Sequence, residues 1–354
     1  MRETKIEGQK QINTAIIGYG FSGSVFHAPF IQKHPRFNLH SIVTSGNRAG
    51  TVYPNTQIVR DINRVTDNPE IDLVVICTPH FLHTGQAELA IDAGKHVIIE
   101  KPVALNSAGF IRIMEKAAKK GKLIFPFHNR RWDGDFLTVK KILAEGHLGE
   151  IVSFESRFDR YTPVLNRAEW RYLNEDGGGT LFDLGTHLID QSLCLFGKPT
   201  SVFCLLYNQR ERSKANDSFD LKLIYPRHTA SLRASVFTRE PGLRFEVHGT
   251  YGSYVKYFFD RQEESLKRGI IPDNKNFGLE PRKCFGILHT EKGTDKQKIK
   301  YPTQRGNYMG FWDDVAATLL GKKPQEVTPE SALLNLNIIE AAFLSHKEKC
   351  IVDL

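Results

Sequence analysis

Short apolar runs alternate with segments of helical periodicity through residues 1–129. Six of these runs are predicted as strands: Thr14–Ile17, Leu39–Val43, Gln57–Val59, Leu73–Cys77, His96–Glu100 and Leu123–Phe127. An unbroken apolar strand must be covered on both faces, and the helices between the runs can supply both layers. The order therefore predicts an α/β domain over residues 1–129, built as a doubly wound parallel sheet.

Residues 130–354 follow a different period. Apolar and polar residues alternate, which is typical of strands with one buried face. The candidate strands are Ile151–Phe158, Ser201–Tyr207, Phe219–Leu223, Ala230–Val236, Leu243–Val247 and Tyr254–Phe259. They predict an open, mostly antiparallel sheet of about six strands in an α+β domain.

The C-terminal region contains a clear helix start. Thr328 can cap the helix, Pro329 suits its first turn, and Glu330 places an acid near the positive end of the helix dipole. We expect a helix over 329–347 that covers the sheet or packs back towards the first domain. The domain 130–354 is expected to bind the substrate and to form oligomer contacts through its open sheet, in a homodimer or a homotetramer.

Composition excludes several classes of protein. The 354 residues are 40% hydrophobic and 25% charged, as in globular domains. No run approaches the roughly 18 apolar residues of a membrane span, and Met1–Ile12 lacks the apolar core of a secretory signal. We expect a cytoplasmic protein without a membrane partner. The five cysteines are scattered and form no C-x-x-C pair, which argues against a disulfide framework or a cysteine zinc site.

The positive charge is not concentrated in one place. Lys and Arg number 48 against 40 Asp and Glu, a formal charge of +8. The densest runs are Lys116–Lys122 and Arg130-Arg131, and the first is typical of the C-terminal turn of a helix. Binding to nucleic acid needs a clustered basic surface, so we expect no nucleic-acid partner and favour a small anionic ligand.

A glycine motif follows the first predicted strand. Gly18, Gly20 and Gly23 have the spacing G-x-G-x-x-G, with Phe21 and Ser22 between them. Such a turn lets a pyrophosphate approach backbone N–H groups at the start of a helix. Because a strand precedes the motif and a helix follows it, dinucleotide binding is favoured over a merely tight turn.

The residues after this motif indicate which dinucleotide binds. NAD-binding domains usually carry an acid about 20 residues further on, yet no Asp or Glu occurs between Gly23 and Asp61. The second predicted strand ends instead in Thr44-Ser45-Gly46-Asn47-Arg48. The Ser45 hydroxyl and the Arg48 guanidinium suit a 2′-phosphate. We expect NADP rather than NAD; the alternative is that Arg48 is an ordinary loop cation.

A second motif, Glu100-Lys101-Pro102, stands at the C-terminal end of the fifth predicted strand, where ligands of open α/β sheets bind. A lysine there can stabilise a developing alkoxide or relay a proton. The Lys-Pro peptide bond could be cis. The tripeptide has low specificity, and a lysine exposed to solvent is the alternative.

The third motif runs from Gly177-Gly178-Gly179 to Asp190. Asp183, His187 and Asp190 would project from one face of a helix, where a carboxylate and an imidazole can transfer a proton. The three glycines would let the loop approach a ligand closely. No second His or Glu stands at ligand spacing, so we expect no metal. The structural alternative is a capping Asp and a histidine satisfied within the core.

With these residues the chain resembles the Gfo/Idh/MocA family of NAD(P)-dependent sugar and polyol oxidoreductases, over nearly its whole length. Within the family it is similar to the branch containing NADP-dependent scyllo-inositol dehydrogenases. The resemblance includes the three motifs and the stretches Ser24–Pro29, Thr78–His83, His128–Asp133, Phe245–Gly252, Val255–Tyr257 and Asp260–Glu263.

The resemblance implies roles for single residues. Lys101 matches the catalytic lysine of the family, His187 its acid/base histidine, and Asp183 the acid that orients substrate hydroxyls. The further matches imply contacts with the cofactor from Thr78, Pro79, His83, Glu100, Trp170 and Arg171, and contacts with the substrate from Asn129 and Tyr161.

These matches predict reversible hydride transfer with a cyclic polyol such as an inositol. Two alternatives remain open: an aldose or keto-sugar substrate, and a non-catalytic NADP-binding sensor of the kind that the family also contains. Because a sensor has no need of a full proton-transfer set, Lys101, Asp183 and His187 argue against the second alternative.

Overall fold

The structure, a computed structural model, describes residues 11–165, 177–240 and 242–354. The chain folds into two compact units. The first comprises residues 1–129, 262–277 and 308–332, and the second comprises 130–261, 278–307 and 333–354. Nothing in the periodicity of the sequence indicated that the two later segments, 262–277 and 308–332, belong to the first unit.

The first unit contains a six-stranded parallel sheet with the order β3-β2-β1-β4-β5-β6. Its strands are β1 Ile12–Ile17, β2 Phe37–Val43, β3 Gln57–Val59, β4 Leu73–Ile76, β5 His96–Ile99 and β6 Ile124–Pro126. The prediction of a doubly wound sheet is confirmed. The order changes direction between β1 and β4, which is where such sheets bind ligands, beyond the carboxyl ends of the strands.

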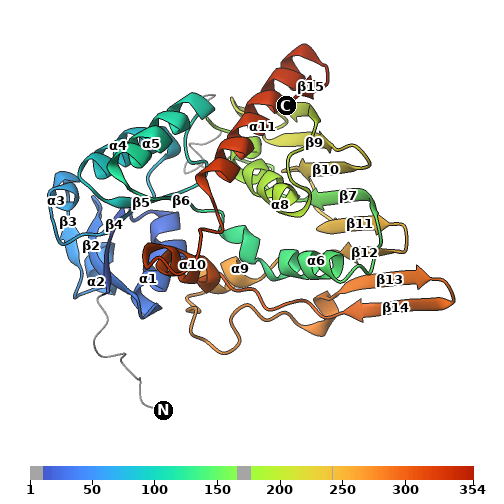
Figure 1. Cartoon of the computed structure of the whole chain (residues 1–354), viewed down its shortest axis with the longest axis horizontal. Coiled ribbons are helices and arrows are strands. Elements are labelled where there is room, and N and C mark those ends of the chain that lie inside the picture. Colours follow the sequence, from blue (N-terminus) through green and yellow to red (C-terminus); the bar gives the residue numbers. More distant parts are fainter. Residues whose placement is uncertain (1–10, 166–176, 241) are drawn as a thin grey trace. The chain divides into compact units, whose positions relative to one another are not determined.

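Helices cover both faces of this sheet, with α4 and α5 side by side on one face and α1 on the other (Figure 1). The helices of this unit are α1 Ala28–Lys33, α2 Arg48–Val52, α3 Asn63–Thr66, α4 His83–Asp92, α5 Ser107–Lys120, α9 Gln262–Lys267 and α10 Met309–Leu319. Helix α5 begins and ends at residues whose types suit those positions. The Asn106 side chain accepts a hydrogen bond from the backbone N–H of Gly109, and Gly121 ends the helix at a φ of 62°.

The second unit contains a nine-stranded sheet with the order β14-β13-β12-β11-β7-β10-β9-β8-β15. Neighbouring strands are antiparallel except β7 and β10, which are parallel. The strands are β7 Ile151–Arg157, β8 Ser201–Tyr207, β9 Ser218–Ile224, β10 Thr229–Ala234, β11 Phe245–Gly249, β12 Gly252–Lys256, β13 Gly286–Lys292, β14 Asp295–Tyr301 and β15 Val352–Asp353. The predicted open, mostly antiparallel sheet is confirmed.

The expected number of about six strands was too low, because β13, β14 and β15 were missed. Residues 296–300 of β14 are all exposed, so this edge strand has no buried face to produce an apolar alternation. The two-residue strand β15 is too short to show any period.

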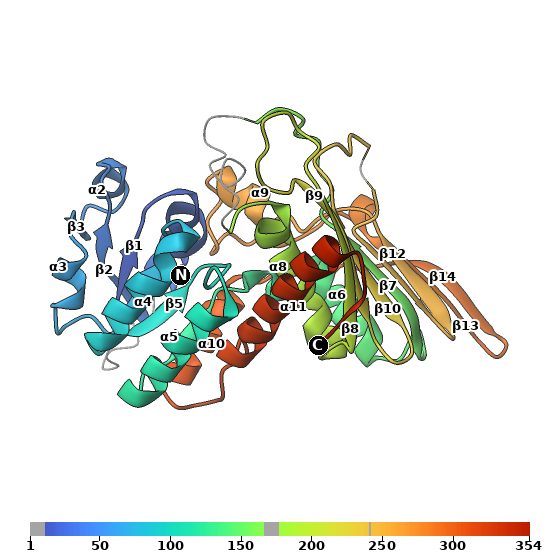
Figure 2. The same cartoon turned by 90° about the horizontal axis from the view of Figure 1, so that it is seen from above.

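The described helices of the second unit lie on one face of its sheet (Figure 2). They are α6 Gly134–Ala144, α8 Thr186–Phe196 and, from residue 333 on, α11 Pro329–Glu348. Leu188 of α8 and Ile339 of α11 are buried in one core with Phe154 and Leu232 of the sheet. Of the predicted C-terminal helix, only residues 329–332 belong to the first unit.

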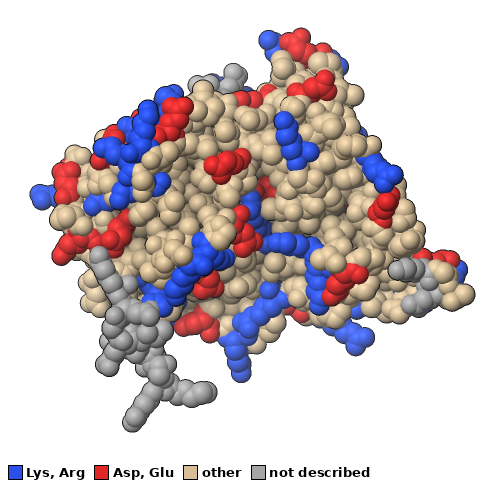
Figure 3. Space-filling view, viewed as in Figure 1, with Lys and Arg blue, Asp and Glu red and all other residues tan. Residues whose placement is uncertain are grey.

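Charges of both signs are interspersed on the face shown in Figure 3. In α5, Lys116 forms an ion pair with Asp92 of α4, and Arg112 forms one with Glu88 of α4. Part of the basic run Lys116–Lys122 therefore has acidic partners. None of the helices in the described ranges has the length and hydropathy that crossing a membrane requires.

Candidate functional site

The glycine motif forms a tight loop between β1 and α1. Gly18 has a φ of +95°, and a Cβ there would lie 3.0 Å from the carbonyl oxygen of Cys77, just after β4. A Cβ on Gly23 would lie 2.2 Å from the carbonyl oxygen of Gly18. At Gly20 no atom lies within 4 Å of such a Cβ. Gly18 and Gly23 therefore serve the fold, whereas Gly20 faces open space where a pyrophosphate can approach the backbone.

The helix after this loop begins with a π-helical turn, η1 Gly23–His27, which continues into α1. The sequence predicted only an ordinary helix start here. Turns of this kind are rare and occur often at functional sites.

Glu100 connects the glycine loop to the end of β5. Its buried carboxylate accepts hydrogen bonds from the Ser22 hydroxyl, from Nε2 of His27 at 2.8 Å and from the backbone N–H of Lys101 at 3.1 Å. Burial by itself would raise the pKa of Glu100, but the hydrogen bond and electrostatic attraction of His27, with the Ser22 hydroxyl, hold it below its ordinary value. Ser22 and Glu100, both predicted to contact the cofactor, thus bond to each other. His27 was not predicted from the sequence.

His83 connects the loops that follow β4 and β5. Its Nδ1 lies 2.9 Å from the carbonyl oxygen of Pro102, and its Nε2 lies 2.9 Å from that of Thr78. Burial lowers the pKa of His83. The Thr78 hydroxyl donates to Gln86 at 2.6 Å, and the Lys101–Pro102 peptide bond is cis. The side chains of Thr78 and His83 therefore shape the two loops, and their contact with a cofactor stays a prediction.

Pro79 of the same loop precedes a single 3₁₀ turn, η2 His80–Leu82. Phe21 of the glycine loop is half exposed, and the ammonium of Lys267 lies 5.3 Å from the centre of its ring. Both positions remain candidates for cofactor contact.

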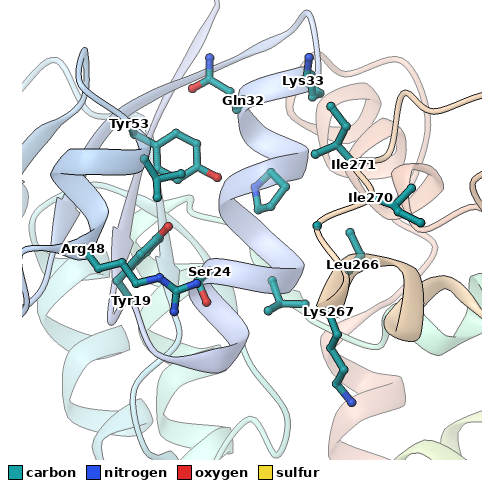
Figure 4. Close-up of a pocket in the computed structure, with 14 residues that line it drawn as sticks. Tyr19, Ser24, Gln32, Lys33, Arg48, Tyr53, Leu266, Lys267, Ile270 and Ile271 are labelled. Carbon is teal, nitrogen blue, oxygen red and sulfur yellow. The ribbon is translucent and has the colours of Figure 1, made fainter.

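A pocket of about 380 Å³ lies beside the glycine loop (Figure 4). Arg48 lines it together with Tyr19, Ser24 and Tyr53. Burial raises the pKa of Tyr19, and the charge of Arg48 opposes this rise. The structure gives Arg48 no hydrogen-bond or ion-pair partner among the described residues. A guanidinium with no such partner beside an open glycine loop suits a phosphate ligand.

In the second unit, Asp183 and His187 lie on either side of a change in helix type. Asp183 is partly buried in a π-helical turn, η4 Leu181–Gly185, and His187 is buried in the first turn of α8. The sequence predicted one regular helix. Hydrogen bonds in a π-helix join residues five apart, whereas those in an α-helix join residues four apart. The relative direction of two side chains four positions apart therefore differs here from that in a regular α-helix.

Asp190 has a structural partner. Its carboxylate accepts hydrogen bonds from Nε of Arg131 at 2.9 Å and from Nη2 at 2.7 Å, and both side chains are buried. Such a bidentate pair fixes geometry. Arg131 therefore fixes α8 one turn beyond His187, a role that sequence spacing did not reveal.

Asn216 holds the segment that leads into η4. Its carbonyl oxygen accepts from the Thr180 N–H at 2.7 Å, and its side-chain oxygen accepts from the Leu181 N–H at 2.9 Å. Gly179 has a φ of +96°, and a Cβ there would lie 2.6 Å from the Asn216 amide nitrogen. The three glycines were expected to let the loop approach a ligand closely. At Gly179 the close neighbour is instead Asn216.

Asn129, Tyr161, Trp170 and Arg171 complete the predicted site. Asn129 is buried at the start of a 3₁₀ turn, η3 Asn129–Trp132. Tyr161 is 42% exposed, and the Arg239 guanidinium lies 3.8 Å from the centre of its ring. Trp170 and Arg171 lie outside the described residues. Within the described ranges, no group of three or more His, Cys, Asp or Glu side chains could hold a metal ion.

Two family models match the chain. One, described as the oxidoreductase family with an NAD-binding Rossmann fold, matches residues 12–128. The other, described as the GFO/IDH/MocA C-terminal domain, matches residues 136–255. The two matches fall on the sheet of the first unit and on the first six strands of the second sheet in chain order.

Characterised and uncharacterised relatives match over nearly the full length. The chain is 36% identical to scyllo-inositol 2-dehydrogenase (NADP(+)) IolW of Bacillus subtilis, with 98% of both proteins covered. It is 35% identical to the uncharacterised oxidoreductase YdgJ of Escherichia coli, with 96% of this chain and 97% of that protein covered. The solved structure of yvaA from Bacillus subtilis has a TM-score of 0.94 at 36% identity, covering 98% of this chain and 99% of that chain.

The two glycine positions predict different effects of one methyl group. Gly23→Ala should lower the free energy of unfolding by about 1–3 kcal/mol, because its Cβ would overlap the Gly18 carbonyl oxygen. Gly20→Ala should change this free energy by less than about 0.5 kcal/mol, yet weaken dinucleotide binding. Urea denaturation and NADP titration followed by protein fluorescence measure the two quantities. Equal stability of the two variants would contradict the assignment.

Proposed function

Because the chain belongs to the Gfo/Idh/MocA family of oxidoreductases, we propose that it is an NADP-dependent dehydrogenase acting on a secondary alcohol of a cyclic polyol. The reverse reaction reduces the corresponding ketone, such as an inosose. The full-length similarity to a scyllo-inositol 2-dehydrogenase is the observation that carries the substrate class. YdgJ of Escherichia coli and a relative of similar coverage from Schizosaccharomyces pombe have no substrate in their names, so the substrate rests on the likeness to the scyllo-inositol 2-dehydrogenase.

The residues of the first unit fit NADP. Gly20 leaves its backbone open to a pyrophosphate, and Arg48 has no hydrogen-bond or ion-pair partner among the described residues. We assign the 2′-phosphate to Arg48 and Ser45, because no acid from Ser24 to Arg60 would repel it. When bound, the dinucleotide supplies a nicotinamide ring that accepts or donates hydride at C4.

In this proposal three side chains transfer the proton, stabilise the developing charge and orient the substrate. In the oxidative direction His187 takes the proton of the substrate hydroxyl while the carbon gives up its hydride. Lys101 stabilises the negative charge that develops on the same oxygen. Asp183 accepts hydrogen bonds from neighbouring hydroxyls and so orients the ring. Lys101 belongs to the first unit and His187 to the second.

The buried setting of His187 supports its role. A proton-transferring group works best when it is held in one orientation, since misplacement by a fraction of an ångström costs rate. The Arg131–Asp190 pair fixes the helix on one side of His187. On the other side the Thr186 hydroxyl and carbonyl both bond to the Asn335 side chain, at 3.0 and 2.8 Å.

A panel of substrates tests both the substrate class and the cofactor. Cyclic polyols, aldoses and keto sugars are assayed with NADP and with NAD by the absorbance of the reduced cofactor. We expect the highest kcat/KM for an inositol with NADP, at least about tenfold above NAD, because charge-assisted bonds to the 2′-phosphate are lost with NAD. Equal efficiency with NAD would contradict the cofactor assignment, and an aldose as the best substrate would favour the sugar dehydrogenase alternative.

Replacement of His187 tests the proton-transfer step. His187→Ala should lower kcat by about 10²- to 10⁴-fold, the usual contribution of a general acid or base, with little change in NADP affinity. His248→Ala is the matched control, because His248 lies on β11 and is bonded to Glu246 and Ser253. Unchanged turnover in His187→Ala would refute the role. Tight NADP binding without turnover of any compound by the wild type would favour the sensor alternative.

A further inference from the structure

The loop after β2 presents the two residues assigned to the 2′-phosphate. It is short, and few of its own bonds hold it: the Thr44 N–H donates to the Val59 carbonyl at 3.0 Å, and the Gly46 N–H donates to the Thr44 hydroxyl at 3.2 Å. Arg48 is the first residue of α2, which has only five residues. The positions of Ser45 and Arg48 therefore depend on what fixes the backbone between them.

Arg60, just after β3, supplies that fixation. One arm of its guanidinium, Nη1, donates to the Ser45 carbonyl, and the other, Nη2, donates to the Asn47 side-chain oxygen at 2.7 Å. The planar guanidinium is thus hydrogen-bonded to the loop on both sides of Gly46. A guanidinium can bind two separated acceptors with fixed geometry, whereas the ammonium of a lysine is a compact charge on a flexible stem.

The net charge around the Arg60 guanidinium is positive, because Arg48 and Arg60 carry two positive charges against the one negative charge of Asp61. Asp61 follows Arg60 directly, but its carboxylate accepts from the backbone and side chain of Asn63, at 3.0 and 3.4 Å. Arg48 lines the pocket of Figure 4, where its guanidinium lies near Tyr19 and Ser24. Among the described residues, neither arginine has an ion pair with a carboxylate. Among the described residues, no carboxylate would thus compete with a phosphate for the Arg48 guanidinium.

We propose that Arg60 is a positioning residue for cofactor specificity: its guanidinium holds Ser45 and Asn47 so that Ser45 and Arg48 are presented to the 2′-phosphate of the cofactor. The inference rests on the proposed NADP function. It adds a second arginine, twelve positions beyond Arg48 and just after β3, to the determinants of that preference. The role is selective, because loosening this loop affects only the end of the dinucleotide that carries the extra phosphate.

The test compares Arg60→Ala and Arg60→Lys with the wild type and with Arg64→Ala. Arg64 lies exposed on α3 and has no side-chain bond among the described residues, so its replacement removes the same charge and leaves the hydrogen bonds of Arg60 in place. Calorimetry gives Kd for NADP, NAD, 2′,5′-ADP and 5′-AMP. The two nucleotide fragments differ in the 2′-phosphate, and circular dichroism confirms that each variant is folded.

Arg60→Ala should weaken NADP and 2′,5′-ADP about tenfold, the loss of roughly one charge-assisted hydrogen bond, and leave NAD and 5′-AMP within about twofold of the wild type. Arg60→Lys should bind NADP and 2′,5′-ADP nearly as weakly, since it keeps the charge but loses the planar guanidinium with its two hydrogen bonds. Arg64→Ala should bind all four ligands as the wild type does.

Three other outcomes overturn the inference. Wild-type selectivity in Arg60→Lys would show that charge alone matters, and equal weakening of NADP and NAD in Arg60→Ala would show a purely structural role. An unchanged NADP preference in Arg60→Ala, in a protein whose wild type prefers NADP, would remove Arg60 and leave the proposed function intact. Equal wild-type affinity for 2′,5′-ADP and 5′-AMP would instead contradict the NADP proposal itself.

Discussion

The ligand-binding edge of the first unit depends on the hydrogen bonds that the buried carboxylate of Glu100 accepts. A carboxylate in a protein interior is costly unless donors surround it. Here Ser22 and His27 come from the segment after β1, and the Lys101 N–H comes from the end of β5. Because β4 lies between these two strands in the sheet, the bonds to Glu100 join loops that are not neighbours. The positions of the glycine loop and of Lys101 are thereby set by one group.

The second unit uses buried charges in a similar way. Arg131 bonds to Asp190, and Arg244, which is fully buried, donates to Gln191 at 2.9 Å and to Asp135 at 3.0 Å. Consecutive residues of α8 are thus bonded to two arginines from other elements. Apolar packing alone would hold this helix less specifically, because it is not directional. In the proposed reaction this rigidity keeps His187 in one orientation.

Much of the fold follows from local patterns. Apolar runs, the glycine spacing, Asn106 as a cap and Gly121 as a stop each depend on residues within one turn or one strand, and a single sequence displays them. The bonds between Arg131 and Asp190 and between His27 and Glu100 join residues 59 and 73 positions apart, so no local pattern reveals them. The π-helical turns at Gly23 and Leu181 also contain residues bonded to distant parts of the chain, His27 to Glu100 and the Leu181 N–H to the Asn216 side chain. Site residues could be chosen by type and motif; their partners could not.

The proposed reaction depends on direct transfer of hydride between cofactor and substrate. NADPH carrying deuterium at C4, labelled on one face or the other in separate samples, is incubated with the full-length protein and an inosose, and the product is analysed by mass spectrometry. Because hydride moves from C4 to the carbonyl carbon without exchange with water, one of the two labelled cofactors should give a product with deuterium on the new carbinol carbon, in an amount equal to the NADPH consumed. Product without deuterium from both samples, or bound NADPH that is never consumed, would contradict direct hydride transfer.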